Sequence, residues 1–243
     1  MSYGIMLEVW GEYASFNRPE MKVERVSYEV MTPSAARGFL EAIYWKPQMR
    51  WVIDRIHVLA PIKFSHVRRN EIDSRIPVGG PSGVRSAMKS EKGDLGITVS
   101  NHRQQRAAMI LSDVRYGIVA HVEVLDAQEK DGTLNPHAGS KHVEAFRRRV
   151  RKGQYFHHPY LGCREFPGSF QHVDSEGDWG CPKELEGQRS LGFMLWDMEF
   201  VEDEKGAIVE SNRGRRLSAT ARFFDAMMTN GVLEVPPLSE TRA

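Results

Sequence analysis

The sequence predicts an α+β protein, with a ferredoxin-like domain over residues 1–155 and a smaller, antiparallel β-rich region over residues 156–243. Two observations support this. The order of elements in residues 1–155 is strand, helix, strand, further β-rich runs and helix, which matches a split βαβ arrangement. After that point helical periodicity gives way to irregular and β-rich segments. A glycine- and serine-rich stretch at 73–101 predicts a long mobile loop or insertion in the first domain.

The first strand and the first helix have clear sequence signals. GIMLEVWG, residues 4–11, alternates and is rich in apolar residues, which predicts a strand. The segment PSAARGFLEAIYWKP, residues 33–47, predicts an amphipathic helix that Thr32 caps and Pro47 stops. We expect Tyr44 to project from its last turn and Trp45 to anchor that turn in the core. The apolar stripe of this helix is Ala36, Phe39, Leu40 and Ile43.

The later elements follow from similar patterns. RWVIDRIHVLAPIKF, residues 50–64, predicts a strand, which HVRRNEI either extends or returns along. RAAMILSDVRYGIVAHVEVL contains two β-rich runs separated by Ser112 and Asp113, which predicts a hairpin. A linker rich in Gly, Pro and Asn precedes a helix expected at residues 141–152. In the C-terminal region, RSLGFMLWDMEFVEDEKGAIVESNRG resembles a hairpin that turns at residues 204–206.

Composition is typical of a soluble globular protein, with 41% hydrophobic and 27% charged residues among 243. No apolar run reaches the length of a membrane span, so we expect no membrane contact. The N-terminus lacks the basic region of a signal peptide. The only cysteines, Cys163 and Cys181, form no disulfide framework and no CxxC pair, which suits a reducing cytosol and is weak evidence for a metal site.

Charge is distributed unevenly, although the formal net charge is only +1. The segment SKHVEAFRRRVRKGQYFHHPY carries six basic residues (lysine or arginine) and one acid, and HVRRN and SNHRQQR are further basic runs. Basic runs with aromatic residues between them are typical of proteins that bind a polyanion. A single run would more often be a solvated helix face. Three runs in a near-neutral protein favour nucleic acid.

Two blocks of the sequence resemble a known family. RPEMKVERVSYEVMTPSAARGFLEAIYWKPQMRWVIDRIHVLAPIKF and KHVEAFRRRVRKGQYFHHPYLGCREFPGSF are similar to the CRISPR-associated Cas five family, in its type I-C (Dvulg) branch. The resemblance implies a RAMP-superfamily protein with an RRM-like, ferredoxin-like N-terminal domain. It implies a metal-independent endoribonuclease that cleaves precursor CRISPR RNA at the base of the repeat hairpin. It also implies that the protein stays on the 5′ tag of mature CRISPR RNA in the cytoplasmic Cascade complex, beside the backbone and large subunits of that complex.

The same resemblance implies which residues act. The family pairs a tyrosine at the end of the first helix with a later lysine–histidine dipeptide, and these match Tyr44, Lys141 and His142. It implies no cofactor and no metal. The residues expected to contact RNA, from the matched blocks and from charge, are Lys22, Arg25, Lys46, Arg147, Arg148 and Arg164. We expect only one or two of the helix arginines to share one groove.

Metal-free RNA cleavage uses the 2′-hydroxyl beside the scissile phosphate as nucleophile and leaves a 2′,3′-cyclic phosphate and a 5′-hydroxyl. Histidine, with an ordinary pKa of about 6.5, suits proton transfer, which we assign to His142. Lysine suits a developing oxyanion, which we assign to Lys141. Tyr44 is expected to orient or activate the 2′-hydroxyl. Because neighbouring helical residues point about 100° apart, Lys141 and His142 are expected at a helix start or in a loop.

Other interpretations stay open at this point. Tyr44 and Trp45 could be packing residues, and the protein could be a non-catalytic subunit that caps CRISPR RNA. A metal-dependent nuclease using His157, His158 and acids is a third class, although neighbouring residues rarely chelate one ion. Duplex DNA is a further candidate partner. Arg164 could pair with Glu165 or another acid as readily as with phosphate. Cys163 is expected to be a small buried residue rather than a nucleophile.

Overall fold

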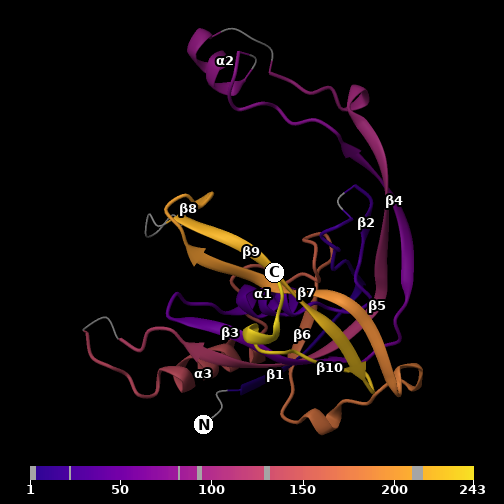
Figure 1. Cartoon of the computed structure of the whole chain (residues 1–243), viewed down its shortest axis with the longest axis vertical. Coiled ribbons are helices and arrows are strands. Elements are labelled where there is room, and N and C mark those ends of the chain that lie inside the picture. Colours follow the sequence, from indigo (N-terminus) through magenta and orange to yellow (C-terminus); the bar gives the residue numbers. More distant parts are fainter. Residues whose placement is uncertain (1–3, 22, 82, 92–94, 129–131, 210–215) are drawn as a thin grey trace.

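A computed structural model gives the fold and describes residues 4–21, 23–81, 83–91, 95–128, 132–209 and 216–243 (Figure 1). Lys22, one of the predicted RNA contacts, lies outside the described residues. The strands are β1 (Gly4–Ala14), β2 (Arg25–Val26), β3 (Met49–Val58), β4 (Phe64–Ile72), β5 (Arg103–Val124), β6 (Ser169–His172), β7 (Gln188–Glu202), β8 (Ile208–Val209), β9 (Arg216–Thr229) and β10 (Val232–Glu234). The α-helices are α1 (Pro33–Ile43), α2 (Val84–Ser90) and α3 (Ala138–Arg151), with short 3₁₀ turns at Val99–Asn101, Glu176–Asp178, Lys183–Leu185 and Leu238–Glu240.

Four antiparallel strands form the ferredoxin-like part of the sheet, in the order β6-β1-β5-β3. Counted along the chain, these strands stand in the order 4-1-3-2 of the split βαβ motif, with α1 after the first and α3 after the third. The predicted fold class is therefore confirmed. The fourth strand, β6, lies beyond residue 155, so strands from both sides of the predicted domain boundary share one sheet. The division at 155 stays a prediction.

The helices α1 and α3 pack side by side against the central strands, and their apolar stripes fill the core. Thr32 caps α1 by accepting a hydrogen bond from the N–H of Ala35 (3.3 Å), as predicted. Phe146 of α3 meets Trp51 of β3 edge to face, with ring centroids 4.8 Å apart. The prediction that Trp45 anchors the end of α1 was wrong, because its side chain is 49% exposed whereas that of Trp51 is 1% exposed.

The prediction of a hairpin at Ser112 and Asp113 was wrong, because both residues lie within the long, continuous strand β5. Asp113 adopts a left-handed backbone (φ 52°), yet the chain continues in the same direction. Its neighbours explain this: Leu111 pairs with both Ala14 of β1 and Phe64 of β4, so β5 passes from one set of partners to the next. Both β3 and β4 run antiparallel to β5, so β4 extends the direction of β3 rather than returning along it.

An arm formed by β4 and the first half of β5 carries the region at 73–101 (Figure 1). The short helix α2 lies at its tip, far from α1 and α3. This region was predicted as a long mobile loop or insertion, and it contains α2 and a 3₁₀ turn rather than loop alone. Its exposed apolar residues did not give a helical signal because the helix is only seven residues long.

The C-terminal region is a long twisted hairpin of β7 and β9 that joins the central sheet through β10. The chain turns after Glu202, as expected, but β7 pairs with β9 rather than with the residues directly after the turn. Asn230 and Gly231 both have positive φ (49° and 75°) and make a two-residue turn into β10. Leu233 of β10 then pairs with Ile56 of β3. None of the described helices is both long enough and apolar enough to cross a membrane.

We expect the free energy of unfolding to fall as pH rises above about 10. Burial raises the pKa of Tyr28, Tyr44 and Tyr116 above the ordinary value of 10.0. In the unfolded chain these phenols ionise at their ordinary pKa. The contribution of the neutral phenols to the free energy of unfolding is therefore fully present below pH 10, and it is lost as pH rises through their folded-state pKa values. Urea denaturation at pH 8 and pH 11 should show a smaller loss for Tyr116→Phe than for the wild type. Tyr155→Phe, which alters an exposed phenol, is the control. Equal losses for Tyr116→Phe and the wild type would contradict the expectation.

Candidate active site

Tyr44 and His142 meet between α1 and α3. The Tyr44 Oη lies 2.9 Å from the Nδ1 of His142, although the two residues are 98 positions apart. Both side chains are buried, with 6% of Tyr44 and 5% of His142 exposed. Tyr44 is the first residue after α1 and has an extended backbone (φ −153°), so its ring leaves the helix direction and points to α3.

Two hydrogen bonds fix the backbone of Tyr44. Its N–H donates to the carbonyl of Leu40 (2.9 Å), which closes the last turn of α1. Its carbonyl accepts from the indole N–H of Trp51 (2.9 Å). Trp51 in turn packs on Phe146 of α3. Buried groups therefore hold Tyr44 between β3 and α3. The helix α1 ends at Ile43, four residues before the predicted stop at Pro47.

Lys141 and His142 point in different directions from α3. The helix begins at Ala138, three residues before the predicted start, so both residues lie within it. Lys141 is exposed and His142 is buried, as the 100° step of a helix requires. Lys141 lines an open cleft of about 660 Å³, which we call the Tyr44 cleft. Its lining consists of Tyr44, Lys46, Lys141, Glu144, Ala145, Arg148 and Arg149.

The Tyr44 cleft is basic and Tyr44 forms part of its wall. Four of its seven lining residues are lysine or arginine and one is acidic. Burial raises the pKa of Tyr44, and the charges of Arg149, Lys141 and Arg148 oppose that shift. The net direction is upward, so Tyr44 is a neutral phenol near pH 7 and can donate a hydrogen bond. His142 is not among the residues described as lining the cleft. It is buried, on the side of Tyr44 that faces the core.

Arg149 is the site residue that sequence reasoning missed. Its Nη1 donates to the carbonyl of Ile43, the last residue of α1 (2.7 Å). Its guanidinium also lies over the ring of Tyr44, 5.1 Å from the centroid. A usable signal was the spacing, because Arg149 follows His142 by seven residues and two helical turns bring both to one face of α3.

The other predicted RNA contacts separate into two groups. Lys46 and Arg148 line the Tyr44 cleft. Arg147 faces elsewhere, with hydrogen bonds to Glu144 (3.0 Å) and to the carbonyl of Gly4 (3.3 Å). Arg164 is exposed in a turn after α3 and does not line this cleft as far as the structure describes it.

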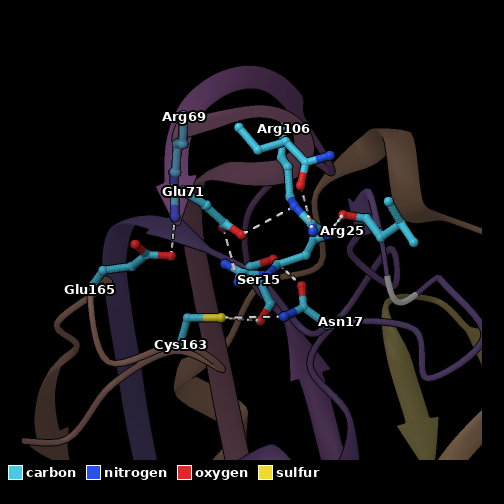
Figure 2. A network of polar contacts seen from close by, with 10 residues as sticks. Ser15, Asn17, Arg25, Arg69, Glu71, Arg106, Cys163 and Glu165 are labelled. Carbon is cyan, nitrogen blue, oxygen red and sulfur yellow. Dashed lines mark hydrogen bonds and ion pairs between the residues drawn. The ribbon is translucent and has the colours of Figure 1, made fainter. Parts of the chain in front are cut away.

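Arg25 belongs to a polar network at the base of the arm, which Figure 2 shows. It pairs with Glu71 (3.0 Å), whose second oxygen lies 3.7 Å from the Nε of Arg106. Arg69 of the same arm pairs with Glu165. The expected alternative of an Arg164–Glu165 pair is therefore replaced by a pair that ties the arm to the turn after α3.

Three further candidates have structural surroundings. Cys163 lies in the same network, within hydrogen-bond distance of Asn17 (3.4 Å), and burial raises the pKa of its thiol. His158 donates from Nδ1 to the carbonyl of Pro159 (2.9 Å), and His157 packs beside the rings of Phe156 and Tyr160. Among the described residues, no group of three or more His, Cys, Asp and Glu is placed to hold a metal ion.

Comparison with known proteins gives consistent matches. A sequence model described as Cas_Cas5d, CRISPR-associated protein (Cas_Cas5), matches residues 4–236. A protein of Mannheimia succiniciproducens, named CRISPR pre-crRNA endoribonuclease Cas5d, is 45% identical over 98% of this chain and 96% of its own length. A protein of the same name from Thermus thermophilus is 42% identical over 96% of this chain and 91% of its own length.

Solved structures agree on the fold. A functionally uncharacterized protein from Streptococcus mutans aligns with a TM-score of 0.63 at 22% identity, over 100% of this chain and 96% of its own. A structure titled as a CRISPR-associated protein aligns with a TM-score of 0.63 at 23% identity, over 100% of this chain and 97% of its own.

We expect Arg149→Ala to lower the free energy of unfolding by roughly 1.5–3 kcal/mol, because it removes a charged donor from the end of α1. Arg148→Ala is the matched control, because Arg148 is next to Arg149 in the sequence and its side chain is exposed. Its free energy of unfolding should stay within about 0.5 kcal/mol of the wild-type value. Urea denaturation at neutral pH measures both. An Arg149→Ala variant as stable as Arg148→Ala would show that the contact with Ile43 does not hold the two helices together.

Proposed function

Because the chain belongs to the Cas5d family of CRISPR-associated proteins, we propose that it is an endoribonuclease that cuts precursor CRISPR RNA. The relatives from Mannheimia succiniciproducens and Thermus thermophilus carry the name of that activity. The observation that carries the proposal to named residues is the contact of Tyr44 with His142 in the wall of a basic cleft. A polyanion whose scissile phosphate enters the Tyr44 cleft meets Lys141 and Tyr44 together.

The proposed reaction is attack of a 2′-hydroxyl on its own phosphate, without a metal. The 2′-oxygen forms a bond to phosphorus, the bond from phosphorus to the 5′-oxygen breaks, and the products are a 2′,3′-cyclic phosphate and a 5′-hydroxyl. One proton passes from the 2′-hydroxyl to the Tyr44–His142 pair and one passes from that pair to the 5′-oxygen, so the proton count of the pair is unchanged. Negative charge grows on the phosphate oxygens, and the position of Lys141 in the lining of the Tyr44 cleft supports a role for its ammonium group in stabilising that charge.

The burial of His142 favours a specific division of roles. Tyr44 is the group of the pair that lines the cleft, and its neutral phenol donates a hydrogen bond to a reacting oxygen. His142 orients that phenol and exchanges a proton with it across the 2.9 Å contact. This division refines the expectation that His142 transfers the proton directly. In this division the proton passes between His142 and the RNA by way of the Tyr44 hydroxyl, and His142 does not contact the RNA itself.

The remaining parts of the proposal concern what the protein binds afterwards. We propose that it stays on the 5′ tag of the mature CRISPR RNA in the cytoplasm, as a subunit of a type I-C Cascade complex with its backbone and large subunits. The basic lining of the Tyr44 cleft supports retention of RNA, and retention should weaken as salt rises. Duplex DNA is a further proposed ligand of the assembled complex.

The test is single-turnover cleavage of the cognate repeat RNA in EDTA. We expect the wild type to cut, and a substrate with a 2′-deoxy nucleotide at the cut site to bind but resist. Tyr44→Phe and His142→Ala should slow cleavage roughly 10²–10⁴-fold, and Lys141→Ala roughly 10²–10³-fold, without loss of folding. Lys183→Ala removes an exposed lysine outside the cleft and should cut like the wild type.

Each contrary result has a defined meaning. A wild type that binds the RNA and leaves it intact, with and without divalent metal, would identify a non-catalytic capping subunit. Cleavage that EDTA abolishes would instead favour a metal-dependent nuclease. Cleavage that the three variants retain would place the reaction at residues other than Tyr44, Lys141 and His142.

A further inference from the structure

A loop of aromatic residues follows α3 and exposes its first two rings. We call residues 155–160, which read YFHHPY, the aromatic loop. Phe156 is 82% exposed and Tyr155 is 45% exposed, although large aromatic side chains are usually buried. The ring of His158 lies beside that of Tyr155, with centroids 5.0 Å apart.

The aromatic loop is attached to the same helix end that presents Tyr44. The N–H groups of Phe156 and His157 both point to the carbonyl of Ala42, at 2.9 and 3.3 Å. Gly153 begins the turn with a left-handed backbone (φ 61°), and the N–H of Gln154 returns to the carbonyl of Arg149 (2.9 Å). These bonds fix the loop relative to Tyr44, which lies two residues after Ala42.

A second open cleft, of about 410 Å³, lies between α3 and the aromatic loop. We call it the Gln154 cleft, and its lining is Arg149, Gly153, Gln154 and Tyr155. Arg149 lines both this cleft and the Tyr44 cleft, so the two are neighbours. An RNA strand whose phosphate lies in one can therefore place an adjacent nucleotide in the other.

We propose that the Gln154 cleft binds one unpaired nucleobase next to the cleaved phosphodiester. The base stacks on Tyr155, and the amide of Gln154 supplies a donor and an acceptor to its edge. Arg149 contributes a positive charge between this base and the phosphate. The inference rests on the proposed function only for the position of the phosphate; stacking of RNA on Tyr155 does not require cleavage.

Charge favours RNA over a protein partner as the occupant. Arg149 and Tyr155 both line the cleft, and the exposed residues Arg148 and Lys152 lie within three residues of Arg149 along the chain, so the ring of Tyr155 lies near cations. Aromatic side chains next to a basic groove are the usual platform for single-stranded nucleic acid. An apolar protein surface would leave these cations without counter-charge.

The experiment measures binding of uncleavable repeat RNA, with a 2′-deoxy nucleotide at the cut site, so that cleavage does not enter. Single abasic substitutions are placed at each unpaired nucleotide flanking the cut. For the wild type we expect one position at which removal of the base weakens binding roughly 5- to 150-fold, the range of one base stack. For Tyr155→Ala we expect the affinity for intact RNA to fall by the same factor. The abasic substitution at the sensitive position should then cause no further loss of affinity.

Three variants make the test specific. Tyr155→Phe keeps the ring and should bind like the wild type, whereas Gln154→Ala should weaken binding and reduce discrimination between bases at the same position. Phe200→Ala removes an exposed ring of β7 and should have no effect. The inference is overturned if Tyr155→Ala binds like the wild type, or if every abasic substitution weakens the wild type and Tyr155→Ala equally. Should Tyr155→Ala not fold, a wild type that shows no abasic-sensitive position overturns it, and one whose sensitive position disappears in Gln154→Ala supports it.

The outcomes also separate this inference from the proposed function. Base-dependent binding by a wild type that never cuts supports the stacking site and rejects the nuclease. A wild type that cuts its repeat but shows no abasic-sensitive position supports the nuclease and rejects the stacking site. Loss of binding to an apolar protein partner, with unchanged RNA binding, would show that the aromatic loop serves protein contact instead.

Discussion

Three consecutive carbonyl groups at the end of α1 determine where Tyr44 lies. The carbonyl of Ala42 accepts from the aromatic loop, that of Ile43 from Arg149 of α3, and that of Tyr44 from Trp51 of β3. A helix leaves its last carbonyls without intrahelical partners, so each of these bonds satisfies a group that would otherwise be buried unpaired. Each contributes roughly 0.5–1.5 kcal/mol, and the charged one about twice that. The end of α1 therefore cannot move without loosening a loop, a helix and a strand together.

The same arrangement sets the chemistry of the phenol. Burial and nearby cations act on the pKa of Tyr44 in opposite directions, and burial is the larger effect. Tyr44 therefore works as a hydrogen-bond donor supported by His142, and the positive charges of the cleft act mainly on the phosphate. Arg149 links these tasks, because its guanidinium bonds α1 and lies over the ring of Tyr44, and the residue lines both clefts.

Local patterns were sufficient to predict the first strand, the helices α1 and α3 and the cap at Thr32, whereas the pairing of Tyr44 with His142 was expected only from the family resemblance. They were insufficient where long-range pairing decides the outcome. Ser112 and Asp113 look like a turn, but β1 and β4 pair on either side of them and keep β5 continuous. Trp45 and Trp51 have the same chemistry, and only the folded chain shows that Trp51 of β3 packs on α3 whereas Trp45 is exposed. The four-residue strand β6 is too short to give a periodic signal.

The prediction of charged contacts was limited in the same way. Arg25 was expected to contact RNA because it lies in a matched block, and Arg147 because it shares a basic run with Arg148. Each has an acidic partner instead, Glu71 for Arg25 and Glu144, one helical turn away, for Arg147. Asn230–Gly231 carries the strongest short-range hairpin signal in the chain, and its use would have predicted β10.

The proposed chemistry requires Tyr44 and His142 to act as one unit, and a double-mutant cycle on single-turnover cleavage tests this directly. The rates of the wild type, Tyr44→Phe, His142→Ala and the double variant would be compared under conditions that saturate binding. If His142 acts through Tyr44, the double variant should be within a few-fold of the slower single variant, because groups that act together are not additive. Rate losses that multiply in the double variant would show that the two residues act independently, and would contradict the account.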